Sequence, residues 1–141
     1  MICIDANVAV KWVLPEEHAE TALALFTDAA QAHQPIVVPP LFPIEATNII
    51  RRQAPKRNIP LEEARRLLER FFTFPVTLSN PPSLHLTAFD IAVTYNLPAT
   101  YDAHYVALAQ LLGCAFWTAD QRLINALAGR LTFVRWIGEY R

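Results

Sequence analysis

Short apolar runs alternate along the chain with longer stretches in which apolar residues recur at spacings of three and four. A short apolar run bounded by polar residues or proline is typical of a buried strand, whereas the three-to-four spacing is typical of a helix with one buried face. The short runs predict five strands: MICID at 1–5, IVVP at 36–39, PVTLS at 75–79, CAFWT at 114–118 and LTFVRW at 131–136.

The stretches between these strands predict helices, because they carry the helical spacing and have prolines near their ends, where proline is tolerated. On them, Ile44 and Ile49 are expected to lie beside the core, as are Phe71 and Phe72. We expect the helices from Pro15 to His33, from Pro40 to a stop before Pro55, from Leu61 to Phe72, over 81–96, over 101–113 with its end at Gly113, and over 120–129.

This alternation of strands and helices determines the expected fold class. Strands separated by helices pair in parallel through right-handed crossovers. The pattern therefore predicts an α/β fold, a three-layer α/β/α sandwich with a central parallel sheet. No repeat, low-complexity segment or long linker divides the chain, so we expect a single domain over residues 1–141, which is long enough for a real core.

Composition narrows the class of protein. Hydrophobic residues make up 53% of the chain and charged residues 18%, which excludes an intrinsically disordered chain. The mean hydropathy of +0.21 favours apolar surface covered by a second chain, although a sheet buried on both faces raises it too. Asp5 and Lys11 interrupt the first apolar stretch, so we expect no membrane-spanning helix. Cys3 and Cys114 are expected to be free thiols, and together these features favour the cytoplasm.

The net charge of −1 conceals an uneven distribution. Residues 1–50 carry one Lys or Arg against six acids, whereas residues 51–70 carry seven basic residues against three acids. Such a basic segment is either a solvated helix face with its own salt bridges or a surface that contacts a polyanion. Lys11, Arg51 and Arg52 are the candidates for contact with phosphate.

Four acids follow or precede the predicted strands at equivalent places. Asp5 ends the first strand, Asp120 follows the fourth, Asp102 opens the helix that leads into the fourth, and Glu45 lies early in the helix after the second. Each acid taken singly has an ordinary explanation as a helix cap or a first-turn acid. Ligands of open parallel sheets bind beyond the carboxyl ends of the strands, so all four acids can converge there.

Converging carboxylates repel one another unless a cation neutralises them. A set of oxygen ligands without a His or Cys cluster favours Mg²⁺ or Mn²⁺ over zinc. Such an ion lowers the pKa of a bound water and stabilises charge on phosphate oxygens, which suits hydrolysis of a phosphodiester bond. The sequence leaves open whether the site holds one ion or two.

Three segments carry a resemblance to a known family: IDANVAVKW, YDAHYVALAQ and FWTADQRL. With Glu45 on its helix, they resemble the ordered acidic motifs of PIN-domain ribonucleases. The size of the chain is similar to that of the VapC-type toxins of toxin–antitoxin pairs, and the likeness runs from about Ile2 to Val134.

The resemblance implies a metal-dependent endoribonuclease with a sheet of order 3-2-1-4-5. It makes four residues the catalytic and metal-binding acids, with Asn7 and Thr118 as supporting polar residues: Asp5, Glu45, Asp102 and Asp120. It also implies an RNA substrate, a cognate antitoxin that docks near the amphipathic segment 60–72, and a homodimer. Contact with DNA is expected only through the antitoxin.

Other interpretations remain open at this stage. A catalytically silent PIN-like module would bind RNA or protein without cutting, but the acidic set is intact. A phosphoryl-accepting domain would need a lysine near a late strand end, and residues 71–141 contain none. His104 is either a general base or a packing residue, and Trp12 either stacks on a base or packs in the core.

Overall fold

Five parallel strands form one sheet in the order β3-β2-β1-β4-β5. The computed structural model describes residues 1–141. The predicted fold class and the strand order implied by the resemblance are both confirmed. The strands are β1 (Ile2–Ile4), β2 (Ile36–Val38), β3 (Thr77–Leu78), β4 (Ala115–Thr118) and β5 (Val134–Trp136).

The strand β1 lies at the centre of the sheet. Ile2 pairs with Ile36 of β2 on one side and with Ala115 of β4 on the other. All three residues of β1 are buried, which explains the uninterrupted apolar run, because a central parallel strand is covered on both faces. The chain leaves β1 and β4 at the same edge of the sheet, so the residues after these two strands are neighbours.

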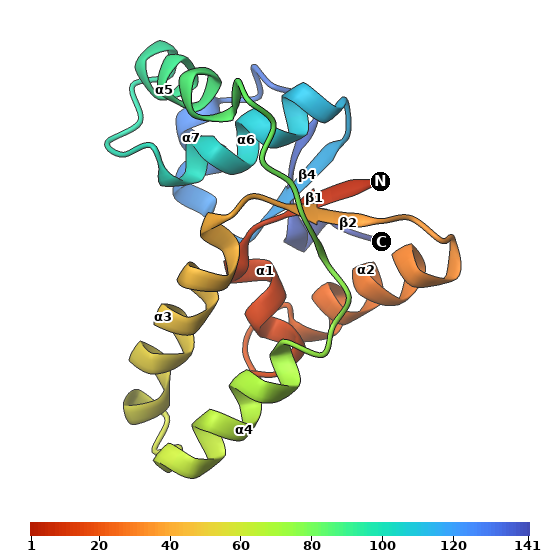
Figure 1. Ribbon diagram of the computed structural model, residues 1–141, viewed down its shortest axis with the longest axis vertical. Helices are drawn as coiled ribbons and strands as arrows, with labels where there is room; N and C mark the ends of the chain where they lie inside the picture. The colour runs from red at the N-terminus through yellow and green to blue at the C-terminus, as the bar shows by residue number, and fades with distance from the viewer.

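Helices cover the sheet on both sides and extend beyond its carboxyl edge (Figure 1). In that view, α5 and α6 lie on one side of the sheet and α2 on the other, while α3 and α4 project together away from it. No helix is both long enough and apolar enough to cross a membrane. The helices are α1 (Ala6–Ala9), η1 (Val10–Trp12), α2 (Ala19–Gln31), α3 (Leu41–Lys56), α4 (Leu61–Phe71), α5 (Leu84–Thr94), α6 (Tyr101–Leu112), α7 (Gln121–Leu127) and η2 (Ile137–Glu139).

Two predicted helix boundaries are wrong. The helix predicted from Pro15 begins at Ala19, after His18 in a left-handed conformation with φ of 63°. The helix predicted to stop before Pro55 continues to Lys56. Pro55 cannot donate a backbone hydrogen bond to the preceding turn, and the helix ends one residue after it. After the helix, Asn58 adopts a left-handed conformation with φ of 55°, and the Ile59 N–H donates to the Ala54 carbonyl at 2.9 Å.

Two residues expected beside the core are exposed instead. Ile44 is 67% exposed on α3, and Phe72, which follows the end of α4, is 53% exposed. Ile49 and Phe71 are buried as predicted. The helical spacing identified the apolar face of each helix, but part of that face lies outside the core of this chain.

Trp12 and the two cysteines pack in or against the core. Trp12 is buried against Phe26, Phe71 and Phe74, and its indole N–H donates to the Ala22 carbonyl at 3.1 Å. It is therefore a packing residue in this structure. Cys3 and Cys114 are both free thiols, as predicted.

Candidate metal centre

Asp5 is held in place by the start of α1. The backbone enters the helix from an extended conformation at Asp5, and Asp5 Oδ1 accepts the Val8 N–H at 2.8 Å. Asp5 Oδ2 accepts the Thr118 hydroxyl at 2.5 Å. Asp5 is only 2% exposed, so its carboxylate is buried. Each carboxylate oxygen has two lone pairs, so both retain the capacity to bind a ligand.

Thr118 connects two of the acids across the central strands. Its buried hydroxyl donates to Asp5 and accepts the Asp120 N–H at 3.0 Å. Asp120 in turn caps α7, where Oδ1 accepts the Arg122 N–H at 2.8 Å and the Leu123 N–H at 3.4 Å. The capping interpretation is therefore correct for Asp120 as well as for Asp5. The second carboxylate oxygen of Asp120 takes no part in the cap.

Glu45 comes from α3 with one oxygen unsatisfied. Glu45 Oε1 is buried without a hydrogen-bond partner, and so is the hydroxyl of Tyr105 on α6. The two groups lie near enough to influence each other: burial raises the pKa of Glu45, and the Tyr105 hydroxyl and the Arg52 charge oppose that rise. Burial and the charge of Glu45 raise the pKa of Tyr105. A buried unpaired oxygen is costly, so Glu45 is suited to a positively charged ligand.

Asp102 lies in the first turn of α6 without capping it, since Thr100 occupies the N-cap position. Burial, together with the charges of Asp120 and Glu45, raises the pKa of Asp102 from 3.8 to about 6. Burial also raises the pKa of Asp5 from 3.8 to about 7; its hydrogen bonds to Thr118 and Val8 oppose the rise, and the charges of Asp102 and Glu45 add to it. The four acids therefore act on one another electrostatically.

A cavity of about 270 Å³ brings three of these acids together. Glu45, Asp102 and Asp120 line it, whereas Asp5 does not. A second cavity of about 350 Å³ is also lined by Asp120, together with Asn7 and Lys11 among others. Asn7 is therefore near Asp120, and Asp120 belongs to both cavities.

The donor set fits a hard divalent cation. All four candidate side chains offer carboxylate oxygens, one of them buried and unpartnered. Burial first, and then the charges of the neighbouring acids, raise the pKa values of Asp5 and Asp102. No three Asp, Glu, His or Cys side chains are grouped closely enough, as they stand, to hold an ion. Binding would therefore have to draw the carboxylates together.

The three basic candidates for phosphate contact differ in whether they already form an ion pair. Lys11 pairs with Glu16 at 3.1 Å, and Glu16 also pairs with Arg57 at 2.7 Å. Arg51 and Arg52 are exposed on α3 and take part in no ion pair. His104 is bonded to the Thr100 carbonyl at 2.6 Å and to His85 at 2.9 Å, so its ring is engaged with its own helix and with α5.

Sequence reasoning missed one residue at this site. Arg122, two positions after Asp120, lines both cavities and pairs with no acid. Its position two residues after a helix-capping aspartate was the only available signal, because a residue in the first turn of a helix stays close to its cap.

Comparison with known proteins agrees with this fold. The family model of the PIN domain matches residues 2–128. The chain is 35% identical over 123 residues to the VapC ribonuclease Mb0985 of Mycobacterium bovis and to ribonuclease VapC9 of Mycobacterium tuberculosis, covering 87% of this chain and 88% of each relative. It is 26% identical over 133 residues to ribonuclease VapC3 of Pyrobaculum aerophilum, covering 93% of this chain and 98% of that protein.

A solved structure has a similar fold. The crystal structure of PAE2754 from Pyrobaculum aerophilum superposes with a TM-score of 0.70 over 97% of this chain and 89% of that chain, at 18% sequence identity. This match concerns the fold alone. The family model spans most of the sequence, including the positions of all four acids, and the mycobacterial relatives match 87% of it, so the chain belongs to the PIN-domain family, in its VapC branch.

Proposed function

We propose that this protein is a metal-dependent endoribonuclease and the toxin of a type II toxin–antitoxin pair. The observation that carries the proposal is the acidic site itself, in which four carboxylates from separate elements influence one another at the carboxyl edge of the sheet. The names of the relatives support the ribonuclease activity and imply an antitoxin partner. The substrate is RNA, and the reaction is hydrolysis of a phosphodiester bond.

Four side chains would hold Mg²⁺ or Mn²⁺: Asp5, Glu45, Asp102 and Asp120. When bound, the ion lowers the pKa of a water and stabilises negative charge on the phosphate. Asp5 supplies the most rigid part of the site, because the helix cap and Thr118 fix both of its oxygens. Asp120 keeps one oxygen outside its cap, and Glu45 has an unpartnered oxygen that can accept a proton from water.

Cleavage of a mixed RNA pool by purified, antitoxin-free protein tests the proposal. We expect cuts in the presence of Mn²⁺ or Mg²⁺ and none in EDTA, because the carboxylates alone repel the phosphate backbone. Binding of RNA without cleavage under any metal condition would favour the catalytically silent module instead. The cleavage products would also give the first information on the preferred sequence.

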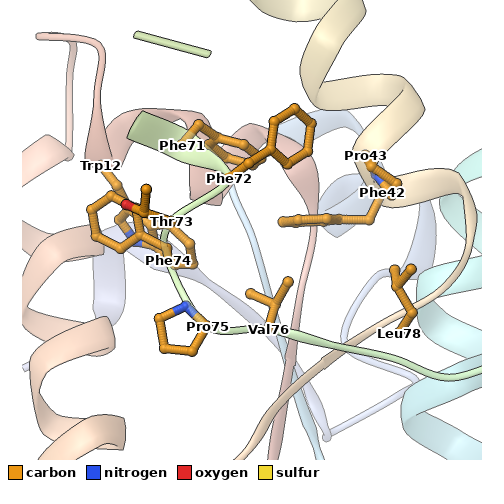
Figure 2. A pocket seen from close by; sticks show the side chains of 10 residues that line it. All are labelled: Trp12, Phe42, Pro43, Phe71, Phe72, Thr73, Phe74, Pro75, Val76 and Leu78. Carbon is orange, nitrogen blue, oxygen red and sulfur yellow. The ribbon is translucent and has the colours of Figure 1, made fainter. Parts of the chain in front are cut away.

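An apolar pocket offers a docking place for the antitoxin (Figure 2). It has a volume of about 330 Å³, and seven of its ten lining residues are hydrophobic. Phe42 and Phe71 stack at its wall with ring centroids 5.6 Å apart, and the exposed Phe72 lies beside them. Phe42 is three residues before Glu45 on α3, so the wall of this pocket lies within one helical turn of Glu45. We propose that an apolar antitoxin segment binds here, and that DNA is contacted only through the antitoxin.

A strip of apolar residues on α5 is suited to a homodimer. Leu86, Phe89 and Val93 are 74%, 59% and 66% exposed and lie on one face of the helix. We expect the double substitution of Leu86 and Phe89 by glutamate to halve the mass measured by light scattering, from a dimer to the 15.9 kDa chain. Thr94→Glu, on another face of the same helix, is the control and should leave the mass unchanged. An unchanged mass in the double variant would contradict this interface.

A further inference from the structure

Two arginines approach the acidic site without an acidic partner. Arg52 is exposed on α3, and Arg122 is exposed in the first turn of α7. Neither lies within 4.0 Å of a carboxylate oxygen. A guanidinium near several carboxylates would normally form an ion pair with one of them. The absence of an ion pair at Arg52 and Arg122 therefore needs an explanation.

Arg122 is tied to the site through its backbone. Its N–H donates to Asp120 Oδ1 at 2.8 Å, while its side chain lines the cavity that contains Glu45 and Asp102 as well as the cavity that contains Asn7. The side chain therefore lies where the two cavities meet. A strand that runs from one cavity to the other would pass directly by this guanidinium.

Arg52 is related to the site through Glu45 on α3. It follows Glu45 by seven residues, which is two helical turns and about 10.5 Å along the axis of α3, on the same face. Side chains on a helix lean toward its N-terminus, so Arg52 leans back toward Glu45. Its charge already acts on Glu45, whose pKa it holds down against the effect of burial. Arg51 points about 100° away around the helix and has no such relation to the acids.

Several other basic side chains near these elements are paired with acids. Lys11 and Arg57 share Glu16, at 3.1 Å and 2.7 Å. On α4, Arg65 pairs with Glu69 at 3.5 Å and Arg66 with Glu62 at 3.8 Å. Among the basic residues that line the two cavities or follow Glu45 on its face of α3 within two turns, Arg52 and Arg122 therefore carry the positive charge that is still available.

We propose that Arg52 and Arg122 form a phosphate-binding pair that holds the RNA backbone on the two sides of the acidic cavity. The inference rests on the proposed ribonuclease function and names the residues that position its substrate. Guanidinium groups bind phosphate through two parallel hydrogen bonds, which fixes orientation as well as affinity. The positive charge of the pair also offsets the repulsion between the four carboxylates and the phosphate groups of the RNA strand.

Binding of a fluorescently labelled single-stranded RNA to Asp102→Asn protein measures this role apart from cleavage. In that background, Arg52→Ala and Arg122→Ala should each weaken binding about tenfold at low salt and reduce the slope of log K against log salt concentration by about 0.7 per lost phosphate contact. Arg122→Lys keeps the charge but loses the paired hydrogen bonds, so it should retain most of the slope and recover only part of the affinity. Arg66→Ala, which removes an exposed arginine on α4, is the matched control and should leave the slope unchanged.

Cleavage by the protein without the Asp102 substitution separates a failure of the phosphate-binding pair from a failure of the proposed ribonuclease activity. Wild-type cleavage in Mn²⁺ together with unchanged slopes in both arginine variants would overturn the phosphate-binding pair and leave the ribonuclease intact. An equal loss in Arg66→Ala would also overturn the pair, because it would reduce the effect to net charge. If the wild type neither cut nor bound RNA, both proposals would fail. Thermal melting of each variant confirms that the fold is retained.

Discussion

Asp102→Asn should reduce RNA cleavage about 100-fold or more, because the ion and the carboxylate charges that hold it supply several kcal/mol to the transition state and 1.36 kcal/mol corresponds to a factor of ten. Asparagine keeps the size of the side chain and removes its charge. Asp102 does not cap α6, so the helix loses no capping bond. The fold should therefore be retained, which distinguishes this variant from a destabilised one. Initial rates with Mn²⁺ and the melting temperature, measured on the same preparation, test both statements.

Asp90→Asn is the matched control for that experiment. Asp90 is an exposed aspartate on α5, outside the cavity that contains Asp102, so the same chemical change should leave the rate within a factor of two of the wild type. Cleavage by Asp102→Asn at the wild-type rate, in protein free of wild-type contamination, would contradict the site. A loss of activity accompanied by loss of the fold would instead show that Asp102 is needed for structure.

The strands and their parallel pairing were the most predictable part of this protein, whereas their order followed only from the family resemblance. The run ICI in β1 is apolar without interruption because both faces of the central strand are buried, and this burial makes such strands visible in a sequence. The missed elements are short. The helix Ala6–Ala9 has four residues, barely one turn, which is too few for a helical period to appear.

The exposure of Ile44 and Phe72 could not be predicted for a different reason. Helical spacing shows which face of a helix is apolar, but it does not show whether that face is covered by the same chain or by another one. Ile44 and Phe72 lie on α3 and just after α4, the two helices that project beyond the sheet (Figure 1). The high mean hydropathy had already indicated such surface without locating it.

The acids of the site could be identified from the sequence, whereas the ion pairing of the basic side chains around them could not. Asp5 and Asp120 stand directly after strands, and the topology alone brings such residues to one edge. The pairing of Lys11 with Glu16 and the freedom of Arg122 depend on side-chain directions in three dimensions. This is why Lys11 was expected to contact phosphate and Arg122 was not considered.

The metal-free protein should lose roughly 3 kcal/mol of stability between pH 5.5 and pH 8, since a shift of one pKa unit corresponds to 1.36 kcal/mol. The pKa of Asp5 is raised to about 7 and that of Asp102 to about 6, both from 3.8, so the folded protein favours their protonated forms. Their contribution to stability is complete below pH 3.8 and is lost as the pH rises through these folded-state values. Denaturant unfolding in EDTA should show this decline. It should become shallower in Asp5→Asn, whose side chain stays neutral, and saturating Mg²⁺ should restore stability at pH 8 in the wild type because the ion binds only the folded chain. A decline of equal size in Asp5→Asn would mean that groups outside the acidic site cause it.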